Sequence, residues 1–485
     1  MLMRPILFPS LVAISLAVVP GRAATQEPLT LQRAIELAQT QGNQAVAARA
    51  TRDAAVFRDR AFSARLLPQL SLGGTVPRYN RAIIPVLQPD GSTLFRPQNQ
   101  TDAGLTATIT QQLPTGGNFF VSSSLATLSV TGDQSIRTWS STPISVGFQQ
   151  DIFRPNTSKL DRREQPYRTE LAERQYLEAR EDIAIQVTNL FFDVHAAGVS
   201  FANATTNVAV NDTLYTLNKG RFEVGKIGEN DLLQSELALL RARTSLDGAR
   251  LELDRAKSSL RLALGLAPDA PIELVVPADV PTFPVDTALA VTEARKNRST
   301  STGAELSEIQ AERRVTEARL NNGFGATVQA SVGFNATASE FDFAYRNLLE
   351  ARQVAVSVDI PLIQWGARRA SVQAAEAERE QAERNARTTL DEAAQDAHYA
   401  ALQLEQSRRA LAISAKADTV AAKRFEVAYN RYVIGRIAID NLYVAQSEKD
   451  QALMQYGQAL RSHWLAYYRL RRLTLYDFER GVPIQ

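Results

Sequence analysis

The sequence predicts an α+β chain made of two repeats, each with helices on both sides of a group of strands. Residues 367–434 contain no glycine or proline, which indicates one helix. At about 1.5 Å per residue this helix is roughly 100 Å long, so it must lie along similar helices in the chain or in other subunits. Residues 67–153 and 324–363 instead alternate bulky residues with small or polar ones, as strands do.

The first residues, 1–23, have the pattern of a secretory signal peptide. Arg4 supplies the positive start, residues 6–19 are apolar, and Gly21-Arg22-Ala23 is a small-x-small cleavage site. The apolar run is shorter than the ~20 residues that a membrane-spanning helix needs, which favours a cleaved signal over a membrane anchor. We therefore expect a secreted chain that begins at Ala24.

The mature chain is expected to be electrically balanced and free of thiols. The sequence has 54 Lys and Arg against 52 Asp and Glu, and Arg4 and Arg22 account for the difference. This balance argues against nucleic-acid binding, and the lack of cysteine excludes disulfides and thiolate metal sites. No apolar run of ~18 residues follows the signal, so the chain is expected in the periplasm, outside the cell, or as a β-barrel in an outer membrane.

Each predicted element has a recognisable pattern or boundary. The first repeat, 24–266, is expected to hold a helix at 31–66, strands within 67–153, and helices at 166–219 and 231–264 joined by a tight segment at 220–228. A proline-rich linker, 267–284, separates it from the second repeat at 285–476. That repeat is expected to hold a helix at 286–320, strands at 324–339 and 352–363, and helices at 367–434 and 439–473, with a tail at 477–485.

The duplication is supported by constant spacing within each block. One offset carries Leu31, Ala34, Ile35 and Asn43 onto Val285, Ala288, Leu289 and Asn297. A second, smaller offset carries Arg221, Phe222, Val224 and Gly225 onto Arg431, Tyr432, Ile434 and Gly435. The difference between the offsets places extra residues in the first strand region, where 113–117 has the sequence of a hairpin turn.

The strand pattern fits a pore wall with lipid outside and water inside. Val356 and Val358 alternate with Ser357 and Asp359, for example. A soluble sandwich with one buried face would show the same alternation. The secretory signal favours the membrane, as do Phe153 and Trp365, which lie at corresponding strand-to-helix junctions where interfacial aromatic residues are common. Too few strands are present to close a barrel, so several copies are expected to share one.

Several motifs occur in a fixed order along the chain: Leu31-x-x-Ala34 with Asn43, Arg65-Leu66-Leu67-Pro68 before a strand, Gln150-Asp151-Ile152-Phe153 before a helix, and the paired turns at Gly225 and Gly435. Together they resemble the outer-membrane efflux proteins typified by TolC, over nearly the whole mature chain. The resemblance implies a homotrimer with a β-barrel in outer-membrane lipid, continued by a long periplasmic α-helical barrel. It also implies an exit duct for a tripartite efflux pump or a type I secretion system, working with a periplasmic adaptor and an inner-membrane transporter.

The resemblance also assigns roles to the two glycine turns, which form the periplasmic tip in that family. Adaptor docking is implied for Val224, Gly225, Ile227, Ile434, Gly435 and Ile437. Closing of the aperture is implied for Asp231, which matches a tip aspartate, and for Tyr432, its tyrosine partner from the neighbouring repeat or subunit. The family's second-repeat arginine and aspartate positions fall on Ile437 and Asn441, so the residues one earlier, Arg436 and Asp440, are assigned to the same network.

No catalytic constellation, metal site or cofactor site is expected. His195, His398 and His463 are far apart in sequence, and no Gly-x-Ser-x-Gly, His-Glu-x-x-His or phosphate-loop pattern occurs. The alternative to a duct is a secreted structural coiled-coil protein. Sustained heptads would favour it, whereas the alanine-rich run at 370–422 has small residues on several faces, as a hollow helical barrel would.

Overall fold

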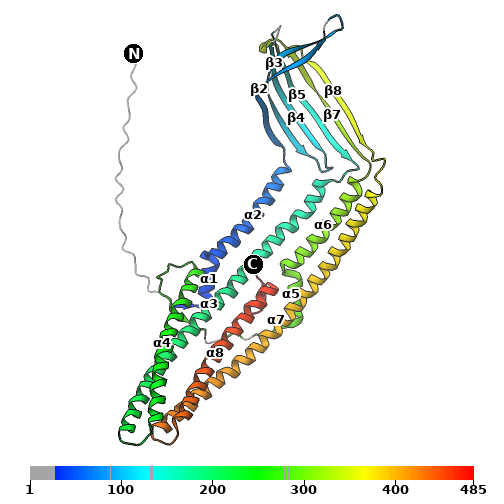
Figure 1. Cartoon of the computed structure of the whole chain (residues 1–485). Coiled ribbons are helices and arrows are strands. Elements are labelled where there is room, and N and C mark those ends of the chain that lie inside the picture. The colour runs from blue at the N-terminus through cyan, green and yellow to red at the C-terminus, as the bar shows by residue number, and fades with distance from the viewer. Residues whose placement is uncertain (1–27, 88, 132–134, 278–279, 282, 485) are drawn as a thin grey trace, which may run out of the picture.

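A computed structural model describes residues 28–87, 89–131, 135–277, 280–281 and 283–484. The predicted signal peptide and cleavage site lie outside these residues. The chain is elongated, with a β-sheet at one end, long helices running away from it, and two helical hairpins at the far end (Figure 1). None of the described helices is long and apolar enough to span a membrane.

The first half of the chain runs up to the sheet, then down to the far end, and then turns back (Figure 1). Its elements are β1 (Leu29–Thr30), α1 (Leu31–Gln41), α2 (Asn43–Arg65), β2 (Gln69–Leu87), β3 (Thr93–Gln112), β4 (Asn118–Thr131), β5 (Ile136–Ile152), α3 (Thr157–Glu223) and α4 (Glu229–Leu264). In the following segment, β6 (Leu274–Val275) pairs in parallel with β1.

The second half has the same order with fewer strands. Its elements are α5 (Thr287–Asn297), α6 (Ser299–Asn321), β7 (Gly325–Ala338), the 3₁₀ turn η1 (Phe341–Phe343), β8 (Leu349–Asp359), α7 (Ala367–Val433) and α8 (Ile439–Thr474). A short hairpin of β9 (Tyr476–Asp477) and β10 (Val482–Pro483) follows. The helix predicted at 367–434 is confirmed by α7, which has 67 residues.

Two helices that the sequence predicted as continuous are interrupted. Gly42 separates α1 from α2 with φ −63° and ψ 143°, and Arg298 separates α5 from α6 with φ −67° and ψ 147°. At Gly42 a Cβ atom would lie 2.5 Å from the Ala38 carbonyl oxygen and 2.8 Å from that of Ala263. The glycine therefore permits a close approach of backbone segments that any larger side chain would block.

Two predicted boundaries were wrong for reasons that involve proline and glycine. The helix expected to begin at Pro166 and end at Lys219 extends from Thr157 to Glu223, with the Asn156 side chain accepting from the Lys159 amide, so Pro166 and Gly220 lie inside it. The strand expected at 352–363 begins at Leu349 and ends at Asp359. Pro361 follows two residues later and has no amide hydrogen for a ladder.

The six longer strands form one antiparallel sheet in the order β2-β3-β4-β5-β7-β8. The turn at 113–117 joins β3 to β4, and both strands pair along their length with neighbours in this sheet. The extra residues of the first repeat therefore extend the sheet. Strands β2 and β8 are its edges.

The two faces of the sheet differ in chemistry, as the alternation predicts. Phe148, Ala330 and Val354 lie opposite one another on β5, β7 and β8, and the next row on the reverse face is Gly147, Ser331 and Gln353. Val354 is 77% exposed. The apolar face thus lacks cover within one chain.

The main apolar core lies far from the sheet, where several long helices meet α1. Most of its buried members come from α1, α3, α4, α7 and α8, among them Ile35, Phe191, Leu260, Leu404 and Leu470, and α2 and α5 each contribute an alanine. A second, smaller cluster lies near the hairpin ends and contains Leu214, Tyr432, Ile439 and Leu442. The two cores hold the α3–α4 and α7–α8 hairpins side by side.

Candidate functional site

The two hairpins reverse direction by the same hydrogen-bond pattern. After α3, the Lys226 amide donates to the Arg221 carbonyl at 2.8 Å, and after α7 the Arg436 amide donates to the Arg431 carbonyl at 2.9 Å. Within these turns Gly225 and Gly435 adopt positive φ values of +71° and +73°. These are the features of a Schellman motif, in which a glycine in the left-handed region ends a helix.

Both glycines are exposed, and a Cβ atom at either would meet no heavy atom within 4 Å. The conformation, and not crowding inside the chain, accounts for glycine at these positions. The space around them is open to a partner.

The apolar residues of the two turns are arranged alike. Val224 and Ile434 are 67% and 64% exposed, whereas Ile227 and Ile437 are half-buried. The four side chains and the two glycines therefore form one end of the molecule, here called the tip: Val224, Gly225, Ile227, Ile434, Gly435 and Ile437. An exposed apolar side chain therefore lies beside each glycine turn at this end of the molecule.

Tyr432 joins the two hairpins just inside the tip. Its side chain is 5% exposed, its hydroxyl donates to Asn218 Oδ1 at 2.8 Å, and the Arg221 guanidinium carbon lies 5.4 Å from the ring centroid. Arg221 also donates to the Val433 carbonyl at 3.3 Å. These contacts attach the end of α3 to the end of α7.

The other residues assigned to closing have different surroundings. Asp231, in the first turn of α4, lines a cavity of about 490 Å³ together with Tyr432 and Asp440. Within the described part of the chain no hydrogen bond joins Asp231 to Tyr432, since the tyrosine hydroxyl is bonded to Asn218. Asp440 accepts from Gln234 Nε2 at 2.7 Å, and Arg436 is exposed.

Solved structures with this architecture include outer-membrane channels. The CmeC channel of Campylobacter jejuni aligns with a TM-score of 0.68 and 15% identity over 99% of this chain and 95% of that chain. VceC of Vibrio cholerae aligns with a TM-score of 0.67 and 15% identity over 94% and 97%. The open MtrE channel of Neisseria gonorrhoeae aligns with 0.63 and 15% over 92% and 88%.

The chain has the TolC-like fold. No family model and no curated protein sequence matches it. At this identity the likeness establishes the arrangement of helices and strands, and the hairpin turns at Gly225 and Gly435 form the end of this fold that lies farthest from the sheet (Figure 1).

Three residues that the sequence analysis did not single out take part in this end of the TolC-like fold: Asn218, Arg221 as a contact of Tyr432, and Gln234. In the second repeat Ala428 occupies the position that corresponds to Asn218. This difference between the repeats, close to the turn, was the one signal in the sequence that could have pointed to Asn218. The pairing itself depends on how two hairpins pack, which the spacing within one hairpin does not determine.

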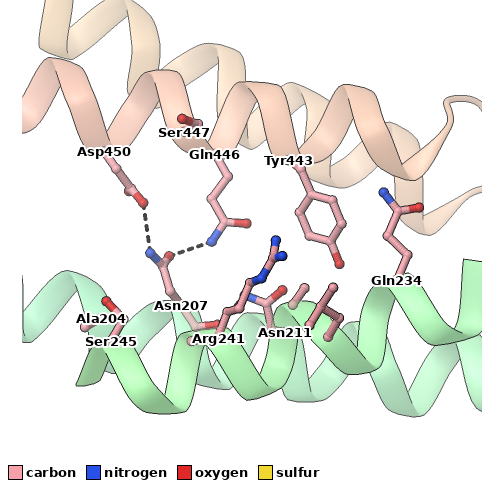
Figure 2. Close-up of a pocket in the computed structure, with 13 residues that line it drawn as sticks. Ala204, Asn207, Asn211, Gln234, Arg241, Ser245, Tyr443, Gln446, Ser447 and Asp450 are labelled. Atoms are coloured by element: carbon pink, nitrogen blue, oxygen red, sulfur yellow. Dashed lines mark hydrogen bonds between the residues drawn. The ribbon is translucent and has the colours of Figure 1, made fainter. Parts of the chain in front are cut away.

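A polar cavity of about 480 Å³ lies above the tip, between α3, α4 and α8 (Figure 2). Asn207 donates to Asp450 Oδ2 at 2.8 Å and accepts from Gln446 Nε2 at 2.7 Å. Tyr443 lines the same cavity, and burial, followed by Tyr432 and Asp440, raises its pKa to about 12. Its hydroxyl therefore stays protonated at neutral pH and has no hydrogen-bond partner among the described residues.

The described residues contain no group of three or more His, Asp or Glu side chains that could hold a metal ion. The geometry of this region consists of helix reversals, exposed apolar side chains and contacts between hairpins.

Proposed function

We propose that this protein is the outer-membrane exit duct of a tripartite efflux pump or a type I secretion system, and that it acts as a homotrimer without enzymatic activity. The observation that carries the proposal is the six-stranded sheet, whose apolar face is exposed and whose edges β2 and β8 have no partner strand among the described residues. In lipid every strand edge must be paired, so the sheets of several copies close into one barrel.

The two faces of the sheet divide between lipid and water. The rows that contain Phe148 and Val354 face lipid, and the rows that contain Gly147, Ser331 and Gln353 face a water-filled interior. Phe153 and Trp365, which are 60% and 94% exposed at the strand-to-helix junctions, lie at the inner lipid interface. The long helices then continue the duct across the periplasm.

The tip is the docking surface for a periplasmic adaptor, which connects the duct to an inner-membrane transporter. Val224 and Ile434 supply exposed apolar contacts, and Gly225 and Gly435 let a partner helix approach the backbone. Asp231, Tyr432, Arg436 and Asp440 control the opening of the tip, with Tyr432 holding the two hairpins of one chain together through Asn218.

Membrane fractionation of cells that express the full-length protein tests the proposal. The expected result is a trimer that resists unheated detergent electrophoresis and is recovered with the outer membrane after density-gradient separation. Recovery as a monomer in the soluble periplasmic fraction would contradict the proposal and favour a structural coiled-coil protein.

A further inference from the structure

We propose that five basic residues at the junction between the sheet and the long helices bind the phosphate groups of anionic phospholipids, in the leaflet of the outer membrane that faces the periplasm. This set is called the basic belt here, and its members are Arg65 on α2, Lys159 and Arg162 on α3, and Arg368 and Arg369 on α7. The inference rests on the proposed function, because it requires the sheet to lie in the membrane.

The helix ends nearest the sheet have an excess of positive charge. The eight residues of α2, α3, α6 and α7 that lie closest to the strands, at 58–65, 157–164, 314–321 and 367–374, include ten Lys and Arg against four Asp and Glu. Over the whole sequence the two kinds are nearly equal, with 54 against 52. The excess is therefore a local feature of the level at which these four helices meet the sheet (Figure 1).

The four carboxylates at this level already have partners within the chain. Arg313 donates to three of them and Gln165 to the fourth; in that order they are Asp161, Glu164, Glu317 and Asp59. The members of the basic belt are all exposed, and within the described part of the chain none of them forms an ion pair. Their charges are therefore available to a partner outside the chain.

Three members of the basic belt occupy positions that a helix by itself disfavours for cations. Lys159 lies in the first turn of α3, and Arg368 and Arg369 lie in the first turn of α7, where the helix dipole favours carboxylates. Neither helix has an acidic residue in this turn, whereas α4 and α8, which begin at the opposite end of the molecule, both do. The internal repeat places Lys159 and Arg369 at corresponding positions. An anionic group beside the belt would offset this unfavourable placement in both repeats.

An exposed apolar layer separates the strands from the basic belt. It lies in the connections between strands and helices, and its members are between 60% and 94% exposed: Leu67, Phe153, Leu362, Ile363 and Trp365. Along the chain the order is therefore apolar strand, apolar and aromatic junction, basic helix end. A membrane–water interface has the same order of hydrocarbon, interfacial aromatic residues and lipid phosphate. This continuity with the face assigned to lipid selects lipid head groups, and not a soluble anion, as the partner of the belt.

The side chains of the basic belt suit this partner. Lysine and arginine have long stems that lie along apolar surface while the charged group reaches toward water, so they can contact head groups from a helix that begins just below them. Arginine also donates paired N–H groups to phosphate. Basic residues beside a membrane attract anionic lipids, and salt weakens the attraction. The belt should therefore enrich an anionic phospholipid over a zwitterionic one, most strongly at low salt.

Quenching of Trp365 fluorescence tests the proposal, because this residue is close in sequence to Arg368 and Arg369. The full-length protein with Trp139→Phe is reconstituted in phosphatidylcholine vesicles that contain the same minor fraction of either brominated phosphatidylglycerol or brominated phosphatidylcholine. The other remaining tryptophan, Trp464, is 9% exposed and belongs to the helical core. Brominated phosphatidylglycerol should quench more strongly at low salt, and the difference between the two lipids should disappear at high salt.

Substitutions in the same background assign the difference to the basic belt. Arg368→Gln with Arg369→Gln should remove it. Arg387→Gln with Arg409→Gln, the matched control at exposed positions farther along α7, should retain it. Circular dichroism and unheated electrophoresis check that each variant keeps its fold and assembly, and the salt dependence of the unsubstituted belt tests the same attraction without any change to it.

The outcomes separate this proposal from the proposed function. Equal quenching by the two brominated lipids, or a difference that survives high salt or the Arg368 and Arg369 substitutions, would overturn the basic belt and leave the duct intact. Absence of quenching by either lipid would place Trp365 outside the membrane and overturn both proposals.

Discussion

Tyr432 and Asn218 are joined across the two hairpins by a 2.8 Å hydrogen bond, although they are 214 positions apart in the sequence. The tyrosine is 5% exposed and the asparagine 1%. The bond therefore lies inside the packed end of the molecule, where loss of one partner leaves the other without a solvent substitute.

Tyr432→Phe should loosen the contact between the hairpins. It removes the donor to Asn218 Oδ1, at a cost of about 1 kcal/mol or more because the acceptor stays buried. We expect a larger open fraction in conductance recordings of the reconstituted protein. Tyr429→Phe, on the same helix and half-buried, is the control. Equal conductance for the Tyr432 variant and the wild type would show that this bond does not hold the tip closed.

Gly225→Ala and Gly435→Ala should weaken adaptor-dependent export. Both positions have positive φ, where an L-residue costs roughly 1–2 kcal/mol, so the turn shifts even though the space around it is open. Gly228→Ala is the matched control, because Gly228 also has open space but a φ of −79°. If export falls equally in all three variants, the cause is the loss of glycine flexibility and not the positive φ of Gly225 and Gly435.

Arginine substitutions on the two faces of β8 should have different effects on assembly and on conductance. Val356→Arg places a charge on the face assigned to lipid, which destabilises a membrane strand, and should reduce the yield of assembled protein in the outer membrane. Ser357→Arg, on the neighbouring residue and opposite face, should assemble normally and lower conductance. Normal assembly of Val356→Arg with loss of assembly for Ser357→Arg would reverse the assignment of the faces.

His463 should make the helical region less stable in acid. Ser407 Oγ donates to the Leu404 carbonyl and lies 3.3 Å from His463 Nδ1, so the ring donates from Nδ1, and its buried Nε2 has no hydrogen-bond partner in the part of the chain that the structure describes. Burial, followed by Arg408, lowers the pKa of His463 in the folded state. The unfolded chain therefore takes up the proton first, and stability falls as the pH drops below ~6.5.

Thermal unfolding between pH 5 and pH 8 measures this effect. The wild type should lose stability toward pH 5, and His463→Asn, which keeps a donor near Nδ1 and cannot be protonated, should lose less. His195 also has a pKa lowered by burial, so a double variant with His195→Asn should flatten the profile further. Identical profiles for the wild type and His463→Asn would exclude His463 as a source of the acid sensitivity.

The long elements were predictable from sequence because their signals are local. The run without glycine or proline predicted α7 to within one residue of its C-terminal end. Gly225 and Gly435 predicted the positions of the two turns. The breaks at Gly42 and Arg298 were not predicted, since the first depends on the approach of Ala263 from another helix. Helix α3 continued through Pro166 because its remaining hydrogen bonds and packing outweighed one missing donor.

The candidate site was only partly predictable. The sequence placed Tyr432 near the tip, but its partner Asn218 lies on α3 in the other repeat and is selected by packing between hairpins. Asp440 was assigned through the family resemblance, as the residue before the family's aspartate position, whereas its bond to Gln234 joins α8 to α4. Contacts of this kind depend on the relative position of elements, which no periodicity within a single helix encodes.

Current through a planar lipid bilayer tests the central claim most directly. The purified trimer should insert and give discrete steps of current, each from one assembled duct, with larger steps or longer openings for Tyr432→Phe. A protein that remains monomeric in solution and gives no steps at any concentration would contradict the claim that this chain forms a membrane duct.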